Sequence, residues 1–300
     1  MASNASNAAI NAVVKKAPAL TKTQTGLDSL NILNQLFTQI LNRKLHTKAV
    51  KIKENSHILD LGCGSGLWVM LMALNPKLSS IIAAYLLEFE GEKVLLNRVT
   101  SIPQTVTFTP VDIKREWTGK ILQHTPYDLI NCRMIKGSMK SWPTIYEKIA
   151  THLTPGTGVF KQFKIDLRFQ YSSGLIPNAL KQWADKLHQA MEEHGMFMRC
   201  DPEEIRCMLL KSGFDNVKER AIIFPINDWP LENDGKKIGK WFNLALTNSL
   251  LPMSLSPLVR TGNNKVKEIN NLINKASEEL NSQARTEGVY CIFYIWTAIA

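Results

Sequence analysis

The stretch His57-Ile58-Leu59-Asp60-Leu61-Gly62-Cys63-Gly64-Ser65-Gly66 decides the fold of this 300-residue chain. A short apolar run leads directly into a glycine-rich turn, and residues 67–74 continue with apolar side chains typical of a helix. Glycines tolerate positive φ and let a ligand approach the backbone, and the first turn of a helix offers unpaired N–H groups. The pattern therefore predicts a strand, a ligand-binding loop and a helix.

The spacing of the glycines indicates which ligand to expect. The loop is Gly-x-Gly-x-Gly, which is shorter than the Gly-x-Gly-x-x-Gly of dinucleotide-binding proteins and fits a mononucleoside without a pyrophosphate. A carboxylate at the strand end can pair with an amino-acid ammonium group, directly or through water. These features predict that S-adenosylmethionine (SAM) is the cofactor, and that it is bound by Asp60, Gly62, Cys63, Gly64, Ser65 and Gly66. The alternative is a tight turn that binds no ligand.

Outward from the loop, strand and helix patterns alternate. Strand patterns occupy residues 57–61, 81–87, 105–109, 127–131 and 159–165, and helical patterns occupy residues 67–74, 91–100, 142–153 and 180–194. Beyond these lie helical patterns at 201–212, 238–250 and 266–280 and strand patterns at 217–224 and 289–297. Alternation of this kind builds a parallel sheet with helices on both faces. We therefore expect an α/β fold, a Rossmann-like class I methyltransferase sheet with an N-terminal helix and a helical insertion before the last strand.

The same patterns divide the chain into three parts. Residues 1–25 are small and polar and predict a flexible leader. Residues 26–55 form an N-terminal segment whose apolar positions between 27 and 45 recur at helical spacing, as in a helix that covers the domain or the mouth of its active site. Residues 56–300 form the SAM-binding domain, in which the helical insertion at 225–288 supplies part of a substrate pocket.

Two further strand ends offer contacts to the nucleoside. The end of the second strand, where we expect an acidic ligand for the ribose, holds Tyr85, and Glu88 is the nearest carboxylate. Glu88 at the start of a solvated helix is the alternative. After the third strand, Asp112 can accept a hydrogen bond from the adenine amino group beside the N–H of Ile113. An aspartate that caps its own loop backbone is the alternative there.

The fourth strand ends with Asn131, Cys132 and Arg133. Ligands in open α/β sheets lie outside the carboxyl ends of the strands, so these residues border the expected pocket, and Asn131 and Arg133 are candidate cofactor ligands. Arg133 can also pair with an anionic substrate, or with an acidic neighbour that has no role in catalysis.

Residues 127–134 (YDLINCRM), followed by Gly137, Ser138, Trp142, Pro143 and Tyr146, resemble the fungal LaeA/UMTA-type methyltransferases. Residues 153–156, 213–217 and 225–230 extend this resemblance, which covers about residues 56–297. It implies a SAM-dependent enzyme of secondary metabolism, or a regulator of it.

The chain departs from the family pattern at a few positions. Tyr85 stands where the family has aspartate, and Thr157 replaces the second glycine of a Pro-Gly-Gly turn. The next strand carries Phe160, Lys161, Gln162 and Phe163 where the family has acidic residues. These departures bear on whether the chain still transfers a methyl group.

Methyl transfer to oxygen or nitrogen often needs a base beside the acceptor. His188 and His194 lie in the helical pattern after the fifth strand, which commonly borders the substrate cavity, and with Arg133 they are the catalytic candidates. A solvated helix face is the alternative for both histidines.

The composition excludes several classes of protein. The net charge is +10, but the basic residues are scattered, which favours a solvated basic surface over nucleic-acid binding. The five cysteines form no Cys-x-x-Cys pair, so we expect no metal. No apolar run approaches the roughly 18 residues of a membrane span. No secretory signal begins the sequence, so cytoplasm is the expected compartment, with the nucleus open, as is a homo-oligomer.

These observations favour SAM-dependent O-, N- or C-methylation of a lipophilic small molecule in natural-product biosynthesis. Large apolar residues in the second half of the chain support an apolar substrate pocket, among them Trp183, Met191, Phe242 and Met253. Two alternatives stay open. One is a methyltransferase-fold cyclase or pericyclase that binds SAM without transferring methyl, and the other is a LaeA-like regulatory protein.

Overall fold

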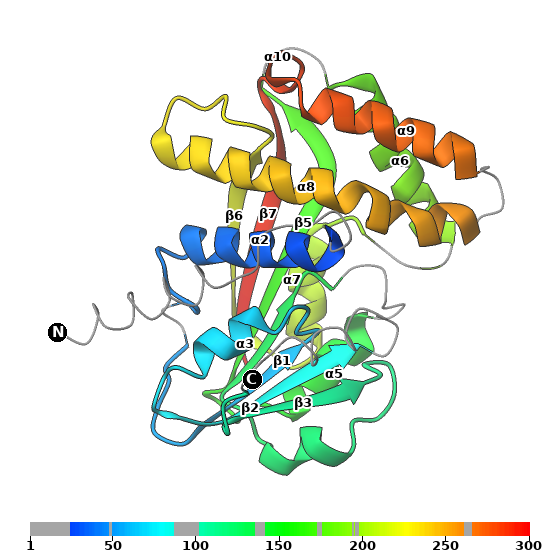
Figure 1. The fold of residues 1–300 in the computed structure, drawn as a ribbon. Helices are drawn as coiled ribbons and strands as arrows, with labels where there is room; N and C mark the ends of the chain where they lie inside the picture. Colours follow the sequence, from blue (N-terminus) through cyan, green and yellow to red (C-terminus); the bar gives the residue numbers. More distant parts are fainter. Residues whose placement is uncertain are drawn as a thin grey trace.

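One seven-stranded sheet with the order β3-β2-β1-β4-β5-β7-β6 forms the centre of the computed structural model (Figure 1). The structure describes residues 25–47, 50–86, 102–135, 142–172, 176–193, 195, 198–260 and 266–300. The strands are β1 (Ser56–Leu61), β2 (Leu78–Leu86), β3 (Val106–Val111), β4 (Leu129–Arg133), β5 (Val159–Tyr171), β6 (Asp215–Pro225) and β7 (Val289–Ile299). Strands β1 to β5 run parallel, whereas β7 is antiparallel to both β5 and β6.

The helices fall into two regions of Figure 1. Around the lower part of the sheet lie α3 (Leu67–Met72), the 3-10 helix η1 (Gly119–His124), α5 (Trp142–Thr151) and α7 (Pro202–Lys211). The upper region holds α6 (Asn178–Glu193) with α8 (Asn233–Arg260), α9 (Val266–Leu280) and the short α10 (Gln283–Thr286), the last three lying between β6 and β7 in sequence. The expected Rossmann-like fold, with a helical insertion before the last strand, is confirmed.

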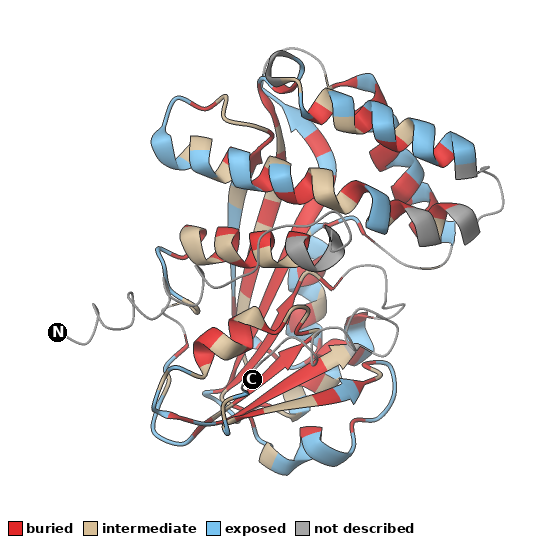
Figure 2. Ribbon diagram, viewed as in Figure 1, coloured by how far each residue is buried: buried red, intermediate tan, exposed pale blue. Residues whose placement is uncertain are grey.

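The N-terminal helix α2 (Thr25–Ile40) lies between these two regions and crosses the sheet (Figure 1). The Phe37 ring stacks on Phe163 of β5 at 5.3 Å and on Phe293 of β7 at 5.0 Å, measured between ring centroids. Burial is densest along the central strands and the faces of the helices that cover them (Figure 2). Helix α2 is therefore part of the folded core.

Three elements end five or more residues away from their predicted ends. Strand β5 continues past residue 165 to Tyr171 because β7 pairs with it from Val159 to Tyr171. Helix α8 continues through Pro252, since packing outweighs propensity there: the Trp183 indole donates to Ser254 Oγ at 2.7 Å. Helix α2 stops at Ile40, before residues with positive φ. The predicted helix at 91–100 and residues 1–24 of the leader lie outside the described residues.

Within the described ranges, no helix has both the length and the apolar character needed to cross a membrane.

Candidate cofactor site

The loop between β1 and α3 takes the conformation that its glycines predict. Gly62, Gly64 and Gly66 have φ values of 69°, 55° and 65°, all in the left-handed region that side chains avoid. The N–H groups of Gly62 and Cys63 both donate to the carbonyl oxygen of Ala84, at 2.9 Å and 3.1 Å, which fixes the loop against β2. The loop is thus held in one shape at the carboxyl end of β1.

A row of buried polar side chains crosses the sheet beside this loop. Asp60 of β1 is in register with Asn131 of β4, and Asn131 is in register with Lys161 of β5. The Asn131 amide donates to Asp60 Oδ1 at 2.7 Å, and Arg133 Nη2 donates to Asp60 Oδ2 at 3.2 Å. Solvent reaches none of the surface of Asp60, Asn131 or Lys161. We call Asp60, Asn131, Arg133 and Lys161 the polar cluster.

Burial dominates the electrostatics of the polar cluster. Burial raises the pKa of the Asp60 carboxyl, and Arg133 and Asn131 oppose that shift by stabilising the charged form. Burial also holds the pKa of the Lys161 ammonium well below its usual range, and the neighbouring charge of Arg133 lowers it further, whereas Asp60 raises it. The cluster therefore contains a cationic residue whose charge the protein alone stabilises poorly.

Three buried atoms of the polar cluster have no hydrogen-bond partner among the residues that the structure describes. They are the acceptor Asn131 Oδ1 and the donors Arg133 Nε and Lys161 Nζ. Native structures leave few such atoms, because an unmade buried hydrogen bond costs about 1–3 kcal/mol. An acceptor and two cationic donors around one carboxylate match the needs of a zwitterionic ligand, with an ammonium at one side and a carboxylate at the other.

Helix α2 packs against the polar cluster. The Asn34 side chain accepts from Arg133 Nη1 and donates to Ser65 Oγ of the glycine loop at 3.3 Å. A Cβ added to Gly64 would lie 3.3 Å from the Leu30 side chain of the same helix. The side chains of α2 therefore contact both the loop and the cluster.

Trp68 at the start of α3 also packs against the polar cluster. The Arg133 guanidinium lies 4.9 Å from the centroid of the Trp68 ring, a cation–π distance. The Trp68 indole donates to the Leu45 carbonyl at 2.8 Å and so connects α3 to the segment after α2. The Arg133 side chain is only 7% exposed to solvent.

The other candidate nucleoside ligands have partners other than the polar cluster, are buried or half-buried elsewhere on the sheet edge, or lie outside the described part of the chain. Asp112 accepts from the backbone N–H of Lys114 at 3.0 Å and pairs with Arg115 at 3.3 Å. Ile113 is buried. Tyr85 is half-buried at the end of β2, and Glu88 lies outside the described residues. Adenine contact by Asp112 and Ile113, and ribose contact by Glu88, stay predictions.

The three catalytic candidates have different surroundings. Arg133 belongs to the polar cluster, where it pairs with Asp60. His188 is buried on α6, which packs in the upper region with α8 and α9 (Figure 1). His194 lies outside the described residues. The polar cluster thus includes one of the three.

The two phenylalanines of β5 that depart from the family pattern lie in different surroundings. Phe160 packs with Tyr146 and Phe214, at ring distances of 5.8 Å and 5.5 Å, in the core beneath α5 and α7. Phe163 stacks on Phe37 of α2, and its ring lies 4.5 Å from Lys161 Nζ. Phe163 therefore borders the polar cluster, whereas Phe160 fills the opposite core.

Sequence reasoning did not select Lys161, Asn34 and Trp68 as site residues. A signal existed for two of them: Lys161 is one of the departures from the family pattern, and Asn34 is a polar residue on the apolar face of α2. Trp68 gave no such signal, because an aromatic residue in an apolar helix is ordinary core.

The chain belongs to the methyltransferase-domain family, whose pattern matches residues 33–219. In fold it is similar to phosphoethanolamine N-methyltransferase 2 of Haemonchus contortus, with a TM-score of 0.50 and 15% identity over 92% of this chain and 57% of that one, a little over half its length. A cyclopropane synthase of Mycobacterium tuberculosis matches with a TM-score of 0.51 and 11% identity over 89% of this chain and 83% of that one. The protein is a class I SAM-dependent methyltransferase.

Within that class, it is similar to proteins of fungi. It is 54% identical to the secondary metabolism regulator LAE1 of Pyricularia oryzae, over 93% of this chain and 84% of that protein. It is 32% identical to the LAE1 protein of Cochliobolus heterostrophus, over 78% of this chain and 74% of that protein. The expected resemblance to LaeA-type proteins is confirmed.

Proposed function

We propose that this chain is a SAM-dependent methyltransferase that acts in the control of secondary metabolism. The observation that carries this proposal is the 54% identity, over nearly the whole chain, to a protein named as a regulator. The polar cluster beside the glycine loop supports it, because the cluster offers what the amino-acid end of SAM requires. Action in the cytoplasm or the nucleus fits such a role.

Each part of the site has a task in this proposal. The Asp60 carboxylate and the unpartnered Asn131 oxygen hold the ammonium group, and the glycine loop lets the nucleoside approach the backbone. Bound SAM supplies a methyl group on a positively charged sulfur. Helix α2 and Trp68 exclude water, so that an acceptor can be aligned with little competition from solvent.

Methylation of a lipophilic small molecule in biosynthesis is the second candidate function. The stacked rings of Phe37, Phe163 and Phe293 next to the polar cluster favour it, since they offer an apolar surface beside the donor site. The larger apolar residues of α6 and of the insertion give less support, because Trp183, Met191 and Phe242 are packed in the buried core.

Deletion and complementation separate the two roles. We expect that deleting the gene changes transcripts of several biosynthetic gene groups at once, and that Asp60→Ala does not restore them although the protein accumulates. Loss of one family of compounds with unchanged transcripts would instead favour a biosynthetic enzyme.

The methyl acceptor is tested directly by incubating the purified chain with SAM labelled in its methyl group, together with a fungal extract. Asp60-dependent label in protein supports the proposal, and label in the organic extract supports the small-molecule acceptor. Label in neither protein nor the organic extract would overturn methyl transfer. Isomerisation of a compound in that case would point to a cyclase.

A further inference from the structure

Lys161 is the buried group that the proposed function has not used. Lys161 lies on β5 in register with Asn131, and its buried Nζ has no hydrogen-bond partner among the described residues. The Phe163 ring, 4.5 Å from Nζ, supplies a weak cation–π attraction but no hydrogen-bond acceptor. A buried lysine in this state is costly unless a ligand completes its surroundings.

The neighbours of Lys161 indicate the charge of that ligand. Arg133 and Phe163 are register partners two residues beyond Asn131 and Lys161, so all four side chains lie on the same side of the sheet. The Arg133 Nε donor on that side has no partner among the described residues. The Asp60 carboxylate already accepts from Asn131 and Arg133. Among the described residues, Asp60 is the acid whose charge acts on Lys161, so one of the two positive charges is left for an anionic ligand to balance.

We propose that Lys161 Nζ, with Arg133 Nε, binds the carboxylate of the amino-acid end of SAM, opposite the ammonium site at Asp60 and Asn131. This inference rests on the SAM site of the proposed function and makes Lys161 a binding residue of that site. Charge-assisted hydrogen bonds from buried donors are among the strongest in proteins, so the contribution of Lys161 to affinity is large.

The same geometry makes ligand binding depend on the protonation of Lys161. Among the described residues, four charged or titratable groups meet here: Lys161 of β5, Arg133 of β4, Asp60 of β1 and His46 after α2. The pKa of His46 is lowered by burial first and by Lys161 among other causes. An anion beside Lys161 raises the pKa of its amine, which burial has lowered. Binding therefore takes up a proton, and affinity falls as pH rises above the pKa of the ligand-free amine.

The test compares two ligands on three proteins by titration calorimetry. S-adenosylhomocysteine carries the amino-acid end, and 5′-methylthioadenosine lacks it. For Lys161→Met we expect S-adenosylhomocysteine to bind about 10- to 100-fold more weakly, because one charge-assisted hydrogen bond is lost. Binding of 5′-methylthioadenosine should stay within about twofold of wild type.

Lys164→Met is the matched control. Lys164 lies on the same strand, is also buried, and stacks over Trp142 at 4.9 Å, outside the polar cluster. This variant should bind both ligands as the wild type does. Equal weakening of both ligands by Lys161→Met, or no weakening of either, would overturn the inference.

Proton uptake by the wild type needs no variant. Titrations with S-adenosylhomocysteine in two buffers of different ionisation enthalpy should show uptake of up to one proton, and Lys161→Met should show none. Release of protons, or no preference of the wild type for S-adenosylhomocysteine over 5′-methylthioadenosine, also overturns the inference. A chain that passes these tests but transfers no methyl group would refute the proposed function and leave Lys161 as the carboxylate ligand.

Discussion

Two Asp–Arg pairs on this sheet have a buried carboxylate. They differ in whether buried hydrogen-bonding atoms around them lack partners. Asp60 and Arg133 are both buried, and around them Asn131 Oδ1, Arg133 Nε and Lys161 Nζ lack partners among the described residues. Asp166 of β5 is also buried, but Arg168 is half exposed.

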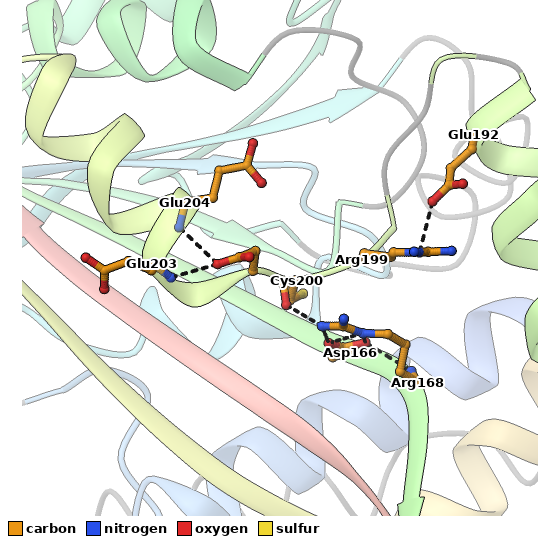
Figure 3. Close-up of polar contacts among 8 residues, drawn as sticks. Asp166, Arg168, Glu192, Arg199, Cys200, Glu203 and Glu204 are labelled. Atoms are coloured by element: carbon orange, nitrogen blue, oxygen red, sulfur yellow. Dashed lines mark hydrogen bonds and ion pairs between the residues drawn. The ribbon is translucent and has the colours of Figure 1, made fainter.

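The second pair uses its donors within the protein (Figure 3). Arg168 Nε donates to both Asp166 oxygens, at 3.0 Å and 2.9 Å, and Arg168 Nη2 donates to the Cys200 carbonyl at 2.7 Å as well as to Asp166. Asp201, the next residue, begins α7 by accepting from the N–H groups of Glu203 and Glu204. The Asp166 pair therefore holds β5 to the segment before α7. Around the Asp60 pair, by contrast, donors and an acceptor remain that can bond a ligand.

Neutralising Asp60 gives the largest expected effect, and the same change at Asp166 separates the two pairs. Asp60→Asn should weaken S-adenosylhomocysteine binding about 100-fold, since the charged acceptor for its ammonium is lost. It should also lower the free energy of unfolding by about 3 kcal/mol, because Arg133 and Lys161 stay buried without a counter-charge. Calorimetric titration and urea unfolding measure the two effects.

Asp166→Asn is the matched control for this prediction. It should lower the free energy of unfolding by about 1 kcal/mol, because the half-exposed Arg168 regains water, and leave affinity within about twofold of wild type. If both variants lost ligand binding equally, the distinction between the two pairs would be wrong.

Two glycine substitutions, one in the glycine loop and one outside it, should give a smaller difference in ligand affinity. Gly64→Ala and Gly156→Ala both place a side chain at positive φ, 55° and 70°, at a cost of about 1–2 kcal/mol each. Only the new methyl at Gly64 meets a neighbour, Leu30 of α2, whereas nothing lies within 4 Å of the one at Gly156. We expect about tenfold weaker S-adenosylhomocysteine binding for Gly64→Ala alone, measured by calorimetry. Equal affinities for the two variants would show that α2 does not shape the site.

Cysteine labelling offers the smallest and most local contrast. Cys132 lies on β4 between Asn131 and Arg133, and burial raises the pKa of its thiol to about 12, so its labelling requires local opening. S-adenosylhomocysteine at five times its Kd should slow labelling of Cys132 by about sixfold, because only the closed state binds ligand. Cys200, buried beside Arg168, should label at an unchanged rate in the same mass-spectrometric experiment. Equal protection of both thiols would indicate global rather than local stabilisation.

The sequence predicted the glycine loop well because its strand, turn and helix are contiguous and need only local information. The polar cluster was harder, since the Asp60–Asn131 contact joins residues 71 positions apart and depends on the register of three strands. Asp60, Asn131 and Arg133 were selected because strand ends are visible in the sequence. Lys161 was not, because its place beside Asn131 follows only from the pairing of β5 with β4. Asn34 comes from a helix whose docking on the loop no local pattern encodes.

A crystal structure of the chain with S-adenosylhomocysteine tests the central claim most directly. The account predicts that the ligand's ammonium lies within hydrogen-bond distance of Asp60 and Asn131, and its carboxylate within that distance of Lys161 and Arg133. A ligand bound elsewhere, with Asn131 Oδ1, Arg133 Nε and Lys161 Nζ still lacking partners, would contradict it.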